Sequence, residues 1–236
     1  MEMVSRAEPD GHTWLLSSTI AAINPALTKM SFDPLRDLAP VIQLGRLQVQ
    51  AYARKDLPAD TLDQLLALMR SRPGALACGT SGGLTRLAAE QLRLRADAAL
   101  VVVDYKGAHL ALNDLAAGHI DMAIGLTGSA TGLLAGGRIR VIMADPSSGG
   151  PAATGAADLG LEGWYAVFAP AATPRTIVER MNAELNQVLL EPEVQKAMRD
   201  IELGAAGGSV EKMASVQRAD TERFARLARQ AGLRPE

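Results

Sequence analysis

Short apolar runs alternate with segments of helical spacing along the first two thirds of the chain. The runs end in glycine or polar residues, and the segments between them carry apolar residues every three or four positions. Strands are expected at 14–16, 41–45, 47–53, 75–78, 99–103, 120–126 and 139–144. Strands that alternate with helices predict βαβ units, so we expect an α/β fold with mainly parallel sheets flanked by helices. The run 99–103 is apolar throughout and β-branched, as in a buried parallel strand.

Helix starts are marked by capping residues. Thr61 and Gln64 form a capping-box pattern, in which each side chain satisfies a backbone N–H of the other's residue. Thr173 followed by Pro174 predicts a second helix, with Thr173 as its cap and proline in its first position. The last helix is expected from about 209 to 231.

The stretch 145–163 is rich in glycine, alanine, serine and proline, which is typical of a linker or a long loop. After it the alternation stops. One strand is expected at 164–169, and everything later has helical spacing.

Composition limits the classes of partner. The chain has 236 residues, a hydrophobic fraction of 48%, a net charge of -2 and 3% aromatic residues, which argues for a large core and against a nucleic-acid partner. Its single cysteine, Cys78, excludes an intramolecular disulfide and a multi-cysteine metal site. No apolar run approaches the roughly 20 residues of a membrane span, and residues 1–10 show no signal-peptide pattern.

A glycine-rich segment, Gly79-Thr80-Ser81-Gly82-Gly83, lies between an expected strand and an expected helix. The first turn of a helix has N–H groups without intrahelical acceptors and the positive end of the helix dipole, so it suits a carboxylate or a phosphate. No Gly-Lys-Ser/Thr follows, so the segment is not a nucleotide P-loop. A plain glycine turn that binds nothing is the alternative to anion binding here.

The same segment matches G-x-S-x-G, the nucleophile elbow of serine hydrolases. A triad on Ser81 would need an acid and then a histidine downstream, which Asp104 with His109 or His119 would supply. A serine hydrolase therefore stays open as an alternative. None of the three histidines has a partner at metal-ligand spacing, so neither a metal nor a cofactor is expected.

Several motifs, taken in order, resemble those of one family, the Bug (TctC-like) substrate-binding proteins of tripartite tricarboxylate transporters. The segments that carry the resemblance are Pro9-Asp10-Gly11-His12-Thr13, Ala22-Ile23-Asn24-Pro25, Phe32 to Val41, Asp104-Tyr105-Lys106-Gly107 and Phe168 to Pro174. Together they span nearly the whole chain. Each motif alone is weak, and their order and spacing make the match specific.

The resemblance implies a two-lobed periplasmic binding protein type II-like fold that is not an enzyme. Such a protein closes over a small organic carboxylate between its lobes and delivers it to subunits of a membrane transporter. The lobes would be 1–55 with 164–236, and 56–163. Compared with the family, the chain lacks a signal peptide and the first strand–helix unit, so a truncated relic that binds nothing is a second alternative.

The resemblance also implies a set of binding residues. The glycine-rich segment corresponds to one carboxylate-binding loop of the family, with backbone donors along it. Side chains at the end of the first expected strand would line the site, and a second helix start would add backbone groups or charge. The residues in this set are Ser17, Ser18, Thr19, Thr80, Ser81, Gly82, Gly83, Tyr105, Lys106 and Gly107.

Overall fold

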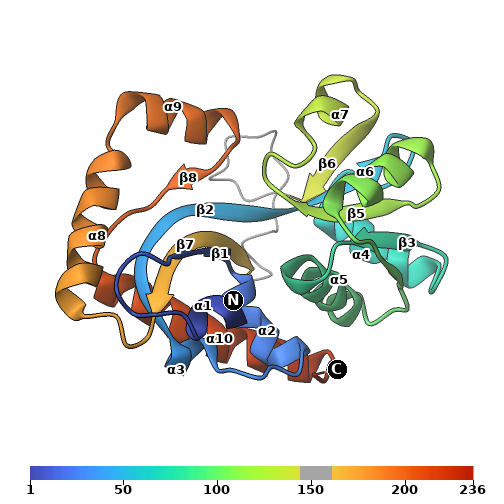
Figure 1. Cartoon of the computed structure of the whole chain (residues 1–236). Helices are drawn as coiled ribbons and strands as arrows, with labels where there is room; N and C mark the ends of the chain where they lie inside the picture. The colour runs from blue at the N-terminus through green and yellow to red at the C-terminus, as the bar shows by residue number, and fades with distance from the viewer. Residues whose placement is uncertain (144–160, 236) are drawn as a thin grey trace. The chain divides into compact units, whose positions relative to one another are not determined.

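The computed structural model describes residues 1–143 and 161–235 (Figure 1). The chain divides into two compact units, one made of residues 1–47 and 163–236 and the other of residues 48–162. We call them unit 1 and unit 2 and describe each by itself. The division into two lobes that close over a ligand, with boundaries at 55/56 and 163/164, stays a prediction.

Unit 1 contains a small sheet flanked by helices. Strand β1 (Leu15–Ser18) pairs antiparallel with β7 (Glu162–Pro170), β7 lies next to β2 (Leu38–Arg54), and β8 (Gly204–Ala205) pairs antiparallel with β2. The helices are α1 (Glu2–Ser5), α2 (Ile20–Leu27), α3 (Pro34–Asp37), α8 (Arg175–Val188), α9 (Pro192–Asp200) and α10 (Val210–Gln230). Helices α2 and α10 pack against each other, and Trp164, Phe168 and Phe224 are fully buried (Figure 1).

Unit 2 is built on the second part of β2. Strands β5 (Met122–Leu126) and β6 (Ile139–Met143) pair antiparallel with β2, while β3 (Ala77–Thr80) runs parallel to both β5 and β4 (Val101–Asp104). The helices are α4 (Leu62–Ser71), α5 (Gly83–Ala96), α6 (Ala108–Ala117) and α7 (Thr131–Ala135). One core cluster joins Tyr52 to α6 and β5.

The α/β fold with helices flanking its strands is confirmed. Parallel pairing, however, is restricted among the recorded pairs to β5, β3 and β4, whereas β1, β2 and β8 pair antiparallel. The expectation of mainly parallel sheets was therefore wrong in part. Apolar periodicity identifies a strand without fixing its direction, which depends on how the connections run.

Several local predictions need correction. The runs 41–45 and 47–53 form one strand, β2, and the polar residues Ser17 and Ser18 belong to β1 rather than to a loop. Val101 in β4 is 48% exposed, because β4 lies at the edge of the sheet and is not the buried strand that its sequence suggested. Of the expected linker, 145–160 lies outside the described residues, and β7 already begins at Glu162.

The two capping predictions had different outcomes. The Thr61 side chain accepts a hydrogen bond from the Gln64 N–H, as expected, and the Gln64 side chain accepts from the Asp60 N–H one residue before the cap. Thr173 does not cap α8. Pro174 occupies the cap position, and the Thr173 hydroxyl is buried without a partner in the described part of the chain.

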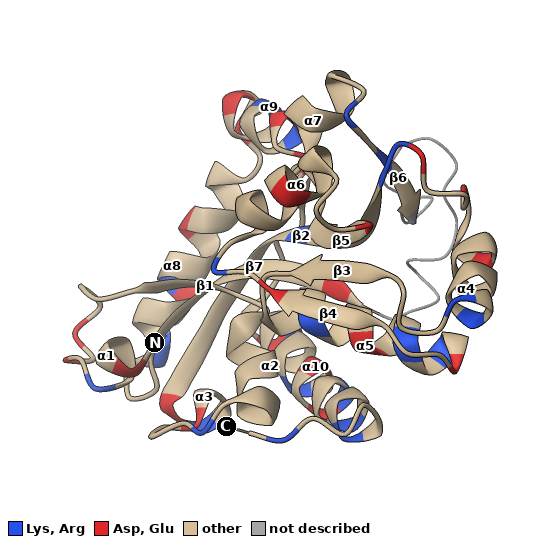
Figure 2. Ribbon diagram, turned by 90° about the vertical axis from the view of Figure 1, so that its right-hand side faces the viewer, with Lys and Arg blue, Asp and Glu red and all other residues tan. Residues whose placement is uncertain are grey.

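Charged residues lie mostly on helices and loops, while the strands are largely free of them (Figure 2). This distribution follows from burial, since most positions of β2, β5 and β7 are buried. Within the described ranges, none of the helices combines the length and the apolar character that crossing a bilayer requires.

Candidate functional site

The turn from β3 into α5 requires its two glycines. Gly82 has φ +78° and Gly83 has φ +50°, a region that residues with a Cβ rarely adopt. Gly82 is the N-cap of α5 and makes no side-chain cap hydrogen bond. In the described structure the N–H groups of Gly82 and Gly83 have no recorded acceptor. These two donors at the positive end of a 14-residue helix are the strongest anion-binding feature of unit 2.

The serine of this turn is already hydrogen-bonded. The Ser81 N–H donates to the Thr85 hydroxyl oxygen at 2.9 Å, and the Thr85 hydroxyl donates to the Gly82 carbonyl at 2.9 Å. Thr85 is only 4% exposed, so this bonded ring is part of the folded core. Ser81 was predicted to offer its N–H to a carboxylate, and this contact stays a prediction, since in this structure the N–H donates to Thr85 instead. The free donors are the next two N–H groups along the chain.

Thr80 ends β3 with its side chain fully buried. Its hydroxyl donates to the Asp104 carboxylate, which also accepts from Arg86 of α5. The Thr80 side chain therefore faces Asp104. Thr80 was expected to contact a ligand, but its hydroxyl is already hydrogen-bonded within the protein.

The turn from β4 into α6 lies beside the first one. The Tyr105 N–H donates to the Thr80 carbonyl at 2.8 Å, which ties the two strand ends together. Gly107 is the N-cap of α6 without a side-chain cap hydrogen bond, and Lys106 is exposed. Because β3 and β4 are parallel, α5 and α6 both begin at the carboxyl edge of the sheet, where α/β proteins commonly bind ligands.

Tyr105 points away from this edge. Its hydroxyl donates to the Asp114 carboxylate of α6 at 2.7 Å, and its ring packs against the core cluster. Burial, with a smaller contribution from Asp114, raises the pKa of Tyr105 to about 12. Tyr105 is therefore a neutral packing residue, and its predicted contact with a ligand does not involve a free hydroxyl.

The three predicted residues of unit 1 lie at the end of β1 and the start of α2. Thr19 is 4% exposed, and its hydroxyl oxygen accepts from the Trp164 N–H at 2.7 Å. This bond fixes β1 against β7, so Thr19 is a structural residue rather than a free ligand. The Ser17 hydroxyl lies 3.7 Å from the Met1 sulfur, and the Ser18 hydroxyl oxygen accepts from the Ile20 N–H at 3.4 Å.

The residues of the alternative serine triad have other partners. The Asp104 carboxylate is bonded to Thr80 and Arg86, and His119 lies 3.5 Å from Asp114. The imidazole of His109 folds back over Gly107, where an added Cβ would lie 2.9 Å from it. No recorded bond joins Ser81 to a histidine in the described structure. No group of metal-ligating side chains gathers there either.

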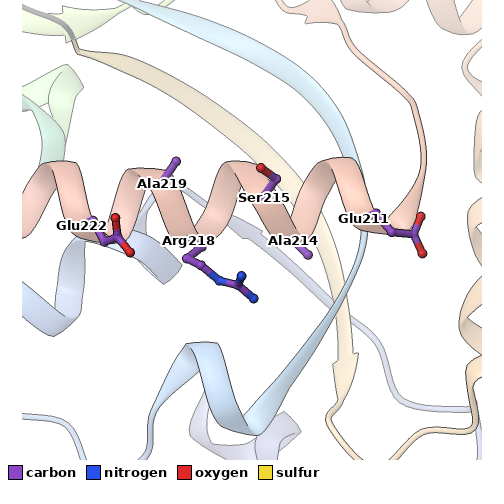
Figure 3. A pocket seen from close by; sticks show the side chains of 6 residues that line it. All are labelled: Glu211, Ala214, Ser215, Arg218, Ala219 and Glu222. Atoms are coloured by element: carbon purple, nitrogen blue, oxygen red, sulfur yellow. The ribbon is translucent and has the colours of Figure 1, made fainter.

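A surface hollow of about 420 Å³ lies on unit 1 (Figure 3). Its lining comes from one face of α10 alone: Glu211, Ala214, Ser215, Arg218, Ala219 and Glu222. Small side chains between longer charged ones produce such a depression on any helix. A second hollow of about 400 Å³ is lined mainly by residues between 25 and 35, with Thr221 of α10 and Pro235 completing it. We assign neither hollow a function.

Thr85 and Arg86 belong to this site although no sequence motif indicated them, and Asp104 was expected there only as a possible triad acid. The spacing of Ser81 and Thr85, four residues apart at a helix start, is a local signal that was available. The contact of Asp104 with Thr80 depends on strand register, with these two residues directly opposite each other, and no local pattern reports it.

Comparison with known proteins identifies the family to which the sequence is similar. The family model described as "Tripartite tricarboxylate transporter family receptor" matches residues 1–233. The UPF0065 protein in the tcbD-tcbE intergenic region of Pseudomonas sp. (strain P51) is 32% identical, over 96% of this chain and 71% of that protein. Protein BugT of Bordetella pertussis (strain Tohama I) is 31% identical, over 83% of this chain and 64% of BugT. The chain thus spans only about two thirds of BugT.

Among solved structures, that of R. palustris Rpa4515 with adipate superposes with a TM-score of 0.87. The two sequences are 26% identical, and the match covers 99% of this chain and 82% of the other.

Proposed function

Because the chain belongs to the Bug (TctC-like) family of tripartite tricarboxylate transporter receptors, we propose that it binds a small organic carboxylate and delivers it to a membrane transporter. Proteins of this family bind solutes for transport. The proposal assigns the carboxylate of the ligand to the start of α5. It assigns no chemical reaction to the chain.

One observation carries this assignment: the N–H groups of Gly82 and Gly83 point out of the first turn of α5 with no recorded acceptor in the described structure. A carboxylate offers two acceptor oxygens to such donors, and the helix dipole favours its charge. The start of α6 at Gly107 supplies further backbone donors at the same edge of the sheet. Lys106 is exposed there and adds positive charge.

The cellular setting is also a proposal. The family is periplasmic, and we propose that this chain works in the same compartment. Its partners would be the membrane subunits of a tripartite tricarboxylate-type transporter. Uptake of a labelled carboxylate into vesicles that contain those subunits should require this protein, and uptake that is equal without it would argue against the partnership.

A charge placed beside the donors tests the binding site. Ser81→Asp puts a carboxylate one residue before the N-cap of α5, where a negative charge stabilises the helix. We therefore expect a folded protein whose melting temperature is unchanged or higher. A ligand carboxylate would meet a like charge at the same donors, so its affinity should fall at least tenfold in isothermal titration calorimetry.

Ser81→Asn is the matched control, because it has nearly the same shape without the charge. We expect it to bind within about threefold of the wild type. The assay uses a panel of C3 to C6 mono-, di- and tricarboxylates, since the ligand has to be found first. Equal affinity in Ser81→Asp and Ser81→Asn for an acid that the wild type binds would place the site elsewhere.

A further inference from the structure

Asp104 holds a carboxylate at the edge of the sheet where α5 begins. It ends β4, directly opposite Thr80 at the end of β3. The Thr80 hydroxyl donates to one carboxylate oxygen, and the Arg86 guanidinium donates to the other. Both of these partners are close in sequence to Gly82, two residues before it and four residues after it. The Asp104 carboxylate is thus held from two sides next to the N–H groups at the helix start.

This carboxylate is fixed in place but still accessible. The Asp104 side chain is 49% exposed, although both of its oxygens accept hydrogen bonds. An ionised carboxylate has about four acceptor positions, of which the recorded bonds use two. The remaining positions are open to a donor from solution.

Arg86, the cation beside Asp104, does not make this place favourable for a ligand anion. Arg86 donates to Asp104 with Nη1, and its Nε and Nη2 lie 3.1 and 3.0 Å from the buried carboxylate of Glu90. Arg93 pairs with the other Glu90 oxygen at 2.7 Å. The network therefore contains two cations and two anions, and Figure 2 shows both charges along α5. The Arg86 side chain is 30% exposed and directs all three of its nitrogens to Asp104 and Glu90, whereas the Asp104 side chain is 49% exposed and keeps acceptor positions open to a ligand donor.

The geometry points to Asp104 as a specificity-determining residue, which selects carboxylate ligands that also carry a hydroxyl or an ammonium group. This inference rests on the proposed function, because the ligand's carboxylate is assigned to the Gly82 and Gly83 N–H groups. A hydroxyl or ammonium donates to Asp104. A ligand whose far end is a second carboxylate is repelled by the like charge of Asp104. A ligand whose far end is a methyl group offers no hydrogen-bond donor to the Asp104 oxygens.

The test compares acids of equal length that differ only at the far end. Adipate, 6-hydroxyhexanoate, 6-aminohexanoate and hexanoate form one set, and the corresponding C4 acids form the other. In calorimetry with the full chain, the hydroxy or amino acid of at least one set should bind at least tenfold more tightly than its diacid and plain acid. A ratio of ten corresponds to about 1.4 kcal/mol, within the range for a hydrogen bond to a charged group.

The variant Asp104→Asn should abolish the preference for the ammonium compound and raise the relative affinity of the diacid. It keeps an acceptor for Thr80 and loses the charge. Asp97→Asn is the control, because Asp97 is exposed at the opposite end of α5 and should leave the ranking unchanged. If Asp104→Asn does not fold in a thermal melt, the wild-type ranking alone decides.

The outcomes separate this inference from the proposed function. Wild-type protein that binds an acid of the panel without favouring the hydroxy or amino compound overturns the role of Asp104 and leaves carboxylate binding intact. A preference for the hydroxy or amino compound that persists in Asp104→Asn also overturns the role of Asp104 and leaves carboxylate binding intact. A protein that binds another acid of the C3 to C6 panel but none of these eight overturns the role of Asp104 alone. No binding of any acid in either panel contradicts the proposed function itself, and the inference fails with it.

Discussion

Gly79→Ala should destabilise unit 2, because α6 packs against the bare backbone of β3. A Cβ at position 79 would lie 2.7 Å from the Ile120 Cδ1, 3.0 Å from the Ala111 Cβ and 3.2 Å from the Tyr105 ring. The Ile120 methyl group can rotate away. The other two neighbours are rigid, since Ala111 is part of α6 and the Tyr105 ring is held by its bond to Asp114.

The size of the effect follows from these distances. Carbon atoms in contact lie about 3.5–4.0 Å apart, so α6 has to move outward by about 0.5 Å. Overpacking of this kind costs about 2–3 kcal/mol, and the reduced chain entropy of alanine offsets about 0.5–1 kcal/mol of it. The net loss of about 1–2.5 kcal/mol should lower the melting temperature by roughly 2–10 °C in a chain of this size.

The assay is a thermal melt followed by circular dichroism, with Gly132→Ala as the control. Gly132 is exposed within α7 of the same unit, and an added Cβ there meets nothing within 4 Å. The same substitution should therefore stabilise by about 0.5–1 kcal/mol at Gly132. A Gly79→Ala protein that melts at or above the wild-type temperature would refute the close packing of α6 on β3.

Three further predictions concern buried groups. Burial raises the pKa of the Cys78 thiol to about 12, so the native protein should not react with a thiol reagent at pH 8, whereas denatured protein should react at one site per chain. The raised pKa of Tyr105, about 12 against an ordinary 10, contributes stability that is present below pH 10 and is lost as the pH rises from 10 to 12. Urea melts at pH 9 and 11.5 should therefore show a smaller pH-dependent loss in Tyr105→Phe than in the wild type. Thr19→Val removes the acceptor of the buried backbone N–H of Trp164 and should lower the free energy of unfolding by about 1–3 kcal/mol in a urea melt. An unchanged midpoint would mean that this bond has no structural role.

Local sequence signals identified most of the elements of the fold. The Thr61 cap, the glycine turn and the apolar faces of the helices depend on residues within about four positions of one another, and all are present in the structure. The same local rule was wrong at Thr173. The Thr173 N–H donates to the Pro170 carbonyl, and this turn buries the hydroxyl that would have served as the cap.

The site was only partly predictable for the same reason. The glycines of the α5 turn were found because their positive φ values are a local requirement. The bonds of Thr80 to Asp104 and of Thr19 to Trp164 join residues 24 and 145 positions apart, which only the folded sheet brings together. Side chains that seemed available to a ligand are therefore used by the fold, and the backbone of the turn is what remains.

Carboxylate binding by the N–H groups of Gly82 and Gly83 can be observed directly at those two groups. The experiment is amide NMR of the 24.8 kDa chain, labelled with nitrogen-15 and titrated with a carboxylate that it binds. We expect both glycine signals to move downfield as the acid saturates the protein, while the amide of Ser81, already bonded to Thr85, moves less. Saturation that leaves the Gly82 and Gly83 signals in place while other amides shift would contradict it.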